Sequence, residues 1–339
     1  MSAPLLSVRN LDVRFTSAGS GGSTVHAVRD LSFDVAAGEA LALLGESGSG
    51  KSVTLRTLLR LHNPLRARVN GRIEVAGQEV LSLEGRALQR YRGGVVSMVF
   101  QEAGSAFDPV YTIGQQIAEF VRAHEPLDAA AARARALEML ERVQIPQARR
   151  RLDAYPHELS GGMRQRAMIA MALACEPRLL IADEPTTALD VTIQAQILDL
   201  LRTLQRETGT AVILITHDLG VVAEVADDVV VMYAGRVVEQ APVATLFEAP
   251  QHPYTVGLLG SIPRLDAQRS RLASIEGQVP SPLRRSSGCS FAERCPFADA
   301  RCRAEAPGLR EVGARHRSAC WKAPLDPQAL MAGLAKAVA

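Results

Sequence analysis

The sequence contains very little lysine. Of its 38 basic residues only three are lysines, and Lys51 is the only one before residue 322. The two basic side chains differ in chemistry, because lysine carries a compact ammonium and arginine a planar fork of donors. A chain that uses arginine almost everywhere else therefore indicates a need for an ammonium at position 51.

The sequence also lacks an excess of charge and any long apolar run. Its 38 basic and 36 acidic residues leave a formal net charge of +2 without a polybasic run, so nucleic acid is not an expected partner. No uninterrupted apolar stretch approaches the roughly 20 residues that cross a bilayer, and the start, MSAPLLSVRN, does not resemble a signal peptide. We expect a soluble, cytosolic protein in which any membrane role belongs to a partner.

Cysteine is scarce and unevenly placed. Four of the five cysteines lie in the last fifth of the chain, at Cys289, Cys295, Cys302 and Cys320. A reducing cytosol argues against disulfides, which makes metal ligation a candidate, although no Cys-x-x-Cys pair supports it. Cys175, in the apolar segment MALAC, is expected to be a small buried hydrophobe.

The apolar pattern predicts an α/β fold. Alternating apolar residues indicate two strands near the N-terminus, within 6–15 and 27–35, in an antiparallel opening. Continuous apolar runs of the kind found in strands buried on both faces occupy 40–44, 179–182, 211–215 and 229–232. Helical patterns occupy 130–143 and 193–204, so the buried strands are expected to form a parallel sheet covered by helices.

Residues 45–52, GESGSGKS, match the phosphate-binding loop pattern between a buried strand and a helical segment. Glycines permit a tight loop whose N–H groups face phosphates, Lys51 can neutralise phosphate charge, and Ser52 can ligate Mg²⁺. The predicted ATP-binding residues here are Gly45, Glu46, Ser47, Gly48, Ser49, Gly50, Lys51 and Ser52.

Two adjacent carboxylates, Asp183 and Glu184, end the apolar run 179–182. Successive side chains of a strand point to opposite faces, so the two are expected to differ in environment and role. Asp183 would support Mg²⁺ and Glu184 would polarise the attacking water.

A third motif distinguishes among phosphate-loop ATPases. Residues 159–166, LSGGMRQR, resemble the signature motif of the ABC ATPase superfamily, although a serine N-cap followed by glycines would explain the same letters in isolation. Further family elements follow in order: Gln101 matches the Q-loop, Asp190 in Ala188-Leu189-Asp190 the D-loop, and His217 the switch histidine.

The resemblance implies a head-to-tail dimer. ATP on the loop of one cassette would be covered by the signature of the other, whose residues are Ser160, Gly161, Gly162 and Gln165. The implied catalytic residues are Glu184, Gln101 and His217, and Mg²⁺ would be held by Ser52, Gln101 and Asp183. Phe15 occupies the position at which the family stacks an aromatic ring on adenine, but a core phenylalanine is equally consistent with the sequence.

The C-terminal segments QHPYTVGLLGSIP, IEGQVPSP and CSFAERCPFADARC resemble those of oligopeptide and dipeptide importer ATPases. This implies two membrane permease subunits, an extracytoplasmic solute-binding protein and a place on the cytoplasmic face of the inner membrane. Residues 62–81 resemble the D-type subunit, which implies a heterodimer with an F-type ATPase. Glutathione, nickel chelates and opines remain alternative solutes.

The same resemblance points to a [4Fe–4S] cluster on the four C-terminal cysteines, with zinc or packed, reduced thiols as alternatives. In one place the chain departs from the family, because residues 102–109 read EAGSAFDP where a DPMTSLNP type of sequence is common. That loop lies near the contact with the membrane subunit, so the partner or solute would differ from those of ordinary oligopeptide systems.

We therefore expect an α/β phosphate-loop NTPase of the ABC type, with an antiparallel β-subdomain, a helical subdomain and a small cysteine-rich C-terminal extension. The high proline content after residue 240 marks the start of that extension. The expected boundaries are 1–104 for the β-subdomain and first part of the core, 105–160 for the helical subdomain, 161–240 for the second part of the core, 241–322 for the extension and 323–339 for a tail.

Overall fold

A computed structural model of the chain describes residues 3–16, 24–101, 103–187, 189–261, 275–281, 283 and 287–326. Glu102 of the departing loop, Ala188 of the expected D-loop and residues 327–339 of the expected tail lie outside the described residues. The chain forms two compact units. The helical unit comprises Met1–Ser7, Asp34–Ala40 and Ile73–Thr216, and the phosphate-loop unit comprises Val8–Phe33, Leu41–Arg72 and His217–Ala339.

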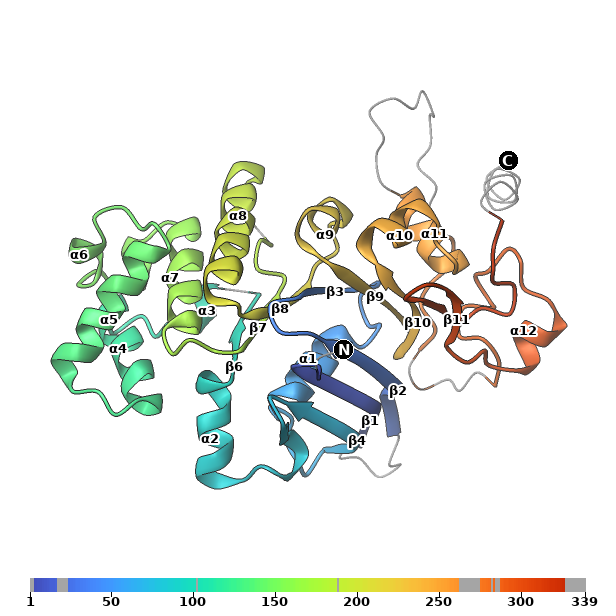
Figure 1. Ribbon diagram of the computed structural model, residues 1–339, viewed down its shortest axis with the longest axis horizontal. Coiled ribbons are helices and arrows are strands. Elements are labelled where there is room, and N and C mark those ends of the chain that lie inside the picture. The colour runs from blue at the N-terminus through green and yellow to red at the C-terminus, as the bar shows by residue number, and fades with distance from the viewer. Residues whose placement is uncertain are drawn as a thin grey trace. The chain divides into compact units, whose positions relative to one another are not determined.

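The N-terminal strands follow the alternating pattern of the sequence. β1 (Leu6–Thr16) lies between β2 (Thr24–Val35) and β4 (Ala67–Val75), and β5 (Gln78–Glu79) pairs with the end of β4 in the antiparallel sense (Figure 1). The two strands expected within 6–15 and 27–35 are confirmed. The strand β4 was not predicted, because its central residues 68–72 have a single apolar side chain, that of Val69, and are exposed or half-buried.

A second sheet forms the centre of the phosphate-loop unit. β3 (Ala40–Leu44) is buried throughout and pairs in parallel with β9 (Asp228–Tyr233), which explains why both segments are apolar on both faces. The sheet continues through β10 (Arg236–Pro242), β12 (His316–Ser318) and β11 (Arg310–Gly313) in antiparallel pairs. The strands β12 and β11 therefore form one edge of the sheet whose strand β3 leads into the phosphate loop.

The helices of this unit are short. Within its described residues they are α1 (Lys51–Leu58), α9 (Leu219–Val225), α10 (Val243–Glu248), α11 (Pro253–Gly260) and α12 (Ala300–Ala304). Three aromatic rings meet in its core: Tyr233 lies 4.7 Å from Tyr254 and 5.2 Å from Phe291 between ring centroids. Edge-on contacts of this kind add to the burial of the rings and join β9, α11 and the cysteine-containing segment.

The helical unit contains the other three buried strands. β7 (Leu179–Asp183) lies between β6 (Val96–Val99) and β8 (Ala211–Ile215), and both pairings are parallel. The predicted strands at 179–182 and 211–215 and the predicted helices at 130–143 and 193–204 are confirmed, the helices as α5 (Ala129–Arg142) and α8 (Val191–Thr208). The remaining helices are η1 (Val80–Ser82), α2 (Gly85–Gly94), α3 (Ala103–Ala106), α4 (Ile113–His124), α6 (Ala148–Arg151), η2 (Pro156–Glu158) and α7 (Gly161–Leu173).

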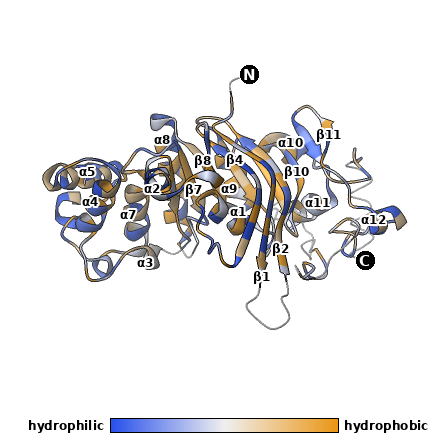
Figure 2. Ribbon diagram, turned by 90° about the horizontal axis from the view of Figure 1, so that it is seen from below, coloured by the Kyte–Doolittle hydropathy of each residue, from blue (hydrophilic) through white to orange (hydrophobic). Residues whose placement is uncertain are grey.

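The helices α4 and α5 pack against each other. Both carry hydrophilic and hydrophobic residues in succession, as expected for helices with one buried face (Figure 2). In the described part of the chain, no helix is both long enough and apolar enough to span a membrane.

A buried carboxylate joins three segments of the phosphate-loop unit. Glu239 of β10 is fully buried and accepts hydrogen bonds from the N–H of Gln251 (2.5 Å) and the N–H of His252 (3.0 Å). Nε2 of His316 in β12 lies 2.7 Å from the same carboxylate. His252 in turn accepts a hydrogen bond at Nδ1 from the N–H of Tyr254 (3.1 Å), which caps α11.

Burial lowers the pKa of His252 to about 3. The ring therefore stays neutral in the folded protein at a pH where the unfolded chain, with an ordinary histidine pKa of about 6.5, takes up a proton. The stability that depends on the neutral ring is present above about pH 6.5 and is lost as pH falls from there toward about 3.

We expect His252→Asn to reduce this acid sensitivity, because asparagine keeps an acceptor for the cap but does not titrate. Below pH 6.5 the wild-type protein should lose up to about 1.4 kcal/mol of unfolding free energy per pH unit through His252, and the variant should not. Thermal unfolding midpoints at pH 7 and pH 5 measure it, with His157→Asn, at an exposed histidine, as the control. If the unfolding midpoint of His252→Asn falls between pH 7 and pH 5 by as much as that of the wild type, the role assigned to His252 is contradicted.

Candidate active site: phosphate loop and catalytic carboxylate

The phosphate loop has the strand-loop-helix setting that the sequence predicts. β3 ends at Leu44, and α1 begins at Lys51 after the left-handed N-cap Gly50, with φ 102°. Gly45 has φ 145°, and a Cβ there would lie 2.2 Å from the carbonyl oxygen of Met232 in β9. Only glycine fits at that position, so the close approach of β9 helps to fix the shape of the loop.

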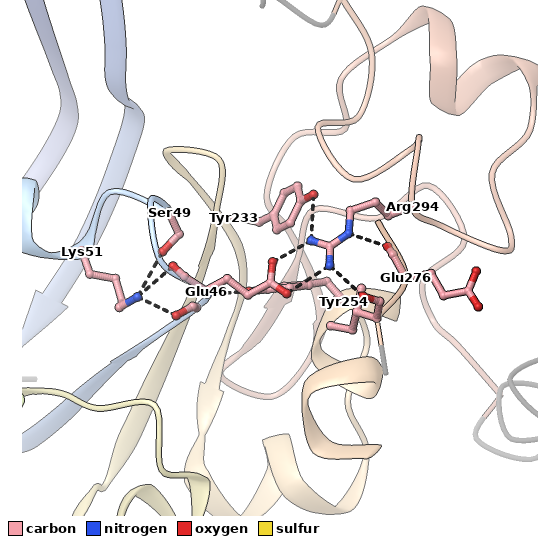
Figure 3. Close-up of polar contacts among 9 residues, drawn as sticks. Glu46, Ser49, Lys51, Tyr233, Tyr254, Glu276 and Arg294 are labelled. Atoms are coloured by element: carbon pink, nitrogen blue, oxygen red, sulfur yellow. Dashed lines mark hydrogen bonds and ion pairs between the residues drawn. The ribbon is translucent and has the colours of Figure 1, made fainter. Parts of the chain in front are cut away.

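The Lys51 ammonium is folded onto the loop (Figure 3). Its Nζ donates hydrogen bonds to the carbonyl oxygens of Gly45 (2.5 Å) and Glu46 (3.0 Å), and to Oγ of Ser49 (3.4 Å). Ser49 is buried, whereas Ser47 and Gly48 at the tip are exposed. The cation is thus held beside backbone N–H groups and a helix N-terminus, an arrangement suited to an anion.

Glu46 makes contacts that the sequence did not predict. Its N–H donates to the hydroxyl of Tyr254 (2.7 Å), and its carboxylate forms an ion pair with Arg294 (2.6 Å). Tyr254 belongs to the HPYT segment that resembles importer ATPases. Nothing in the sequence spacing connects Tyr254 or Arg294 with the phosphate loop. Both the side chain and the N–H of Glu46 are therefore bonded to other residues of this chain.

Phe15 is half-buried and does not belong to the fully buried core. Its ring meets that of His62 edge-on, with centroids 5.1 Å apart and planes at 83°. His62 Nε2 lies 3.0 Å from both the Val53 carbonyl and the Thr57 hydroxyl, and burial lowers the His62 pKa, which favours the neutral ring. This aromatic pair braces Phe15 against α1, and adenine stacking on Phe15 stays a prediction.

Two predicted catalytic residues meet in the helical unit. Gln101, just after β6, donates from Nε2 to Oε2 of Glu184 (2.8 Å). Thr187, which no sequence motif indicated, donates from its hydroxyl to the same oxygen (2.8 Å). Glu184 has φ 49°, a left-handed conformation that is uncommon for a non-glycine residue and that often occurs at functional sites.

Asp183 occupies the end of β7 and is buried, whereas Glu184 is half-buried. The predicted difference in environment between the two carboxylates is therefore present. The only sequence signal for Thr187 was its place in the turn directly after the strand, which is too common to identify a catalytic contact.

The signature segment begins α7. Ser160 is its N-cap and accepts a hydrogen bond from the N–H of Met163 (3.3 Å), so the capping alternative describes the serine in this chain. A Cβ on Gly162 would lie 2.9 Å from Cγ2 of Ile193 in α8. Ser160 and Gly161 are exposed, which leaves them accessible to another molecule.

The other predicted residues lie in or beside α7, α8 and α9. Gln165 is buried within α7. Asp190 caps α8 by accepting a hydrogen bond from the N–H of Ile193 (2.9 Å). His217 is exposed and precedes Asp218, whose carboxylate caps α9. His217 belongs to the phosphate-loop unit, whereas Gln101, Asp183 and Glu184 belong to the helical unit.

The four C-terminal cysteines line one cavity of about 20 Å³, roughly the space of one water. Burial raises the pKa of Cys289 and Cys320, and that of Cys295 to about 12, so these thiols stay protonated near neutral pH. Among the described residues, no group of three or more histidine, cysteine or acidic side chains is arranged to hold a metal ion. The structure therefore does not support the predicted metal site. Cys175 is buried, as predicted.

Comparison with known proteins places this geometry in a family. Residues 28–187 match the model of the ABC transporter family, and residues 238–302 match the C-terminal region of oligopeptide and dipeptide transporters. The dipeptide transport ATP-binding protein DppD of Bacillus subtilis (strain 168) is 49% identical over 318 residues, which cover 94% of both chains. The oligopeptide transport ATP-binding protein OppD of Mycobacterium tuberculosis is 51% identical over 95% of this chain, which spans about half (52%) of that relative.

Solved structures of ATP-binding cassettes have a similar fold. A dimeric ATP-binding cassette in a post-hydrolysis state with ADP and phosphate superimposes with a TM-score of 0.61 and 27% identity, over 70% of this chain and 98% of that one. The cbiO1 protein of Clostridium perfringens, part of an ABC transporter complex, gives a TM-score of 0.61 at 28% identity, over 73% and 92% of the two chains. The chain therefore belongs to the ABC transporter family, as one of its ATP-hydrolysing ATP-binding proteins.

Proposed function

We propose that this chain hydrolyses ATP to drive the import of dipeptides, oligopeptides or a related small solute. The similarity of about half of all residues to dipeptide and oligopeptide transport proteins, extended over 94% or more of this chain, carries the proposal. The match of residues 238–302 to the C-terminal region of such transporters supports it. A nickel chelate, glutathione or an opine is the alternative cargo, because the solute is selected by other subunits.

ATP would bind with its phosphates on residues 45–52. The loop N–H groups and the N-terminus of α1 provide partial positive charge, and Lys51 would exchange its loop carbonyls for phosphate oxygens. Phe15 would stack on adenine with the face of the ring that His62 leaves open, since His62 contacts Phe15 edge-on.

Hydrolysis would depend on Glu184, which Gln101 and Thr187 hold at one carboxylate oxygen. A carboxylate fixed in this way can accept a proton from the attacking water. His217 would bind the γ-phosphate. Mg²⁺ prefers hard oxygen ligands, and Ser52, Gln101 and the buried Asp183 supply such donors. When bound, the ion would neutralise phosphate charge.

Closure would need a second cassette. The exposed Ser160 and Gly161, with Gly162 and Gln165 behind them, would cover the nucleotide of a partner ATPase, and Asp190 would lie at that contact. The proposed partner is an F-type subunit, so the pair would be a heterodimer. Permease subunits and an extracytoplasmic solute-binding protein complete the proposed importer, with this chain on the cytoplasmic face of the inner membrane.

The proposed domain boundaries follow these roles. Residues 1–104 and 161–240 would form the ATP-binding core with its β-subdomain, 105–160 the helical subdomain, 241–322 the extension specific to this importer group, and 323–339 a tail. The departing loop, residues 102–109, would contact the permeases.

We expect Glu184→Gln to abolish turnover, because the amide cannot accept the proton. Phosphate release in the assembled transporter should fall by about a hundredfold or more, with ATP affinity within about threefold of wild type, since the amide can still bind Gln101. Glu207→Gln is the matched control and should keep wild-type turnover, because this exposed carboxylate of α8 lies 3.5 Å from Arg142 of α5 and outside the proposed site. Undiminished hydrolysis by Glu184→Gln would contradict the role, and an inactive wild-type complex would mean that the chain binds ATP without turning it over.

We also propose that the four C-terminal cysteines hold a [4Fe–4S] cluster, with zinc as the alternative. Their convergence on one cavity matches the Cys₄ donor set of such clusters in kind and number. The cavity is small, and burial raises the pKa of Cys289 and Cys295, so binding would require these thiols to lose protons and the four side chains to move outward.

Protein purified without oxygen should therefore absorb near 400 nm and contain about four iron and four sulfide per chain. Cys295→Ser should lose that absorption, and Cys175→Ser, at the buried cysteine outside this cavity, should keep it. Colourless protein that contains zinc would select the alternative ion, and metal-free protein with intact ATPase activity would leave the cysteines as packed thiols.

A further inference from the structure

The guanidinium of Arg294, in the cysteine-containing C-terminal segment 289–302, forms an ion pair with Glu46 of the phosphate loop. Its Nη1 lies 2.6 Å from Oε2 of Glu46 and its Nη2 3.1 Å from Oε1, a bidentate pair between residues 248 positions apart (Figure 3). The Arg294 side chain is only 5% exposed and that of Glu46 is 29% exposed. Ion pairs this sheltered and this well oriented differ from the weak pairs of a protein surface.

The same guanidinium is fixed by its remaining donors. Nε donates to the carbonyl oxygen of Glu276 (2.8 Å), and Nη2 also donates to that of Ile275 (3.0 Å). Nη1 lies 3.4 Å from the Tyr233 hydroxyl. The hydrogen bond to Glu46 raises the pKa of Arg294, so the group stays charged. A lysine could not make these contacts at once, because it has a single donor nitrogen.

Glu46 makes three contacts, and the partners of its backbone and of its side chain are different residues. Its N–H donates to the Tyr254 hydroxyl (2.7 Å), its carbonyl accepts from Lys51 (3.0 Å), and its carboxylate meets Arg294. Figure 3 shows the carboxylate directed toward Arg294, away from the Lys51 ammonium. The negative side chain of the loop is thereby kept on the opposite side from the cation that is suited to phosphate.

We propose that Arg294 is a positioning residue for ATP binding, which neutralises Glu46 and holds its carboxylate away from the triphosphate. A free carboxylate on this loop would repel the polyanionic nucleotide and could compete for Lys51. The inference rests on the proposal that residues 45–52 bind the phosphates. It makes the C-terminal segment a part of the nucleotide site of its own chain.

The test measures the affinity of the full-length chain for a fluorescent ATP analogue. Arg294→Met keeps the apolar bulk but removes the charge, and should raise Kd by about tenfold or more, because it leaves a sheltered carboxylate without its partner. Arg294→Lys should fall between this variant and wild type. Thermal unfolding of each variant reports whether the fold is retained.

Rescue separates positioning from a merely structural role. The double variant Glu46→Gln/Arg294→Met has no carboxylate to repel ATP, so its Kd should return to within about threefold of that of Glu46→Gln alone. If Arg294 only supports the fold of its own segment, the double variant will bind ATP as poorly as Arg294→Met, and the inference is overturned.

A second pair of variants leaves Arg294 in place, for the case that Arg294→Met does not fold. Glu46→Asp keeps the charge but is too short to retain the bidentate pair, whereas Glu46→Gln removes the charge at nearly constant size. The aspartate variant should bind ATP several times more weakly than the glutamine variant. Equal affinities would overturn the inference.

Two controls complete the design. Arg301→Met changes another arginine of the same segment, one that lies over the Trp321 ring, 3.7 Å from its centroid, and should leave Kd within about twofold of wild type. Lys51→Ala tests the underlying proposal. If Lys51→Ala binds ATP normally, the assigned phosphate site is wrong, whereas loss in Lys51→Ala without loss in Arg294→Met refutes the role of Arg294 alone.

Discussion

The carboxylate of Glu239 is a constraint on which much of the phosphate-loop unit depends. A fully buried carboxyl group needs hydrogen-bond partners, and here they are the N–H groups of Gln251 and His252 and Nε2 of His316. These contacts fix where α11 begins, and with it the position of Tyr254. The Tyr254 hydroxyl accepts a hydrogen bond from the N–H of Glu46. Through the position of Tyr254, the buried Glu239 therefore helps to hold one side of the phosphate loop.

What the sequence could predict was local. The phosphate loop, the buried strands and the amphipathic α8 were predicted because each depends on residues that are neighbours in the chain or repeat at a fixed spacing. The pairing of Arg294 with Glu46 spans 248 positions, and no periodicity encodes it. The strands β11 and β12 are only four and three residues long, too short to give a pattern.

The candidate catalytic residues show the same division. Gln101 was identified by resemblance and Glu184 from its place at the end of an apolar strand, and the two side chains meet, at 2.8 Å. Thr187, which bonds the same carboxylate oxygen, was missed because a threonine in a turn has no distinctive neighbourhood in sequence. The left-handed backbone of Glu184 was equally hidden, since only the fold around the end of β7 holds a non-glycine residue there.

The two cations beside the phosphate loop illustrate why arginine and lysine are not interchangeable in this chain. Arg294 must bridge one carboxylate and two carbonyl oxygens at once, and only a planar fork with several nitrogens can do so. Lys51 rests on carbonyl oxygens, neutral partners that an ammonium can leave for a phosphate at a modest cost in free energy. The fixed cation keeps the negative side chain of the loop in place, and the movable one is kept for the ligand. This division explains physically why a lysine stands at position 51 in a chain that otherwise relies on arginine.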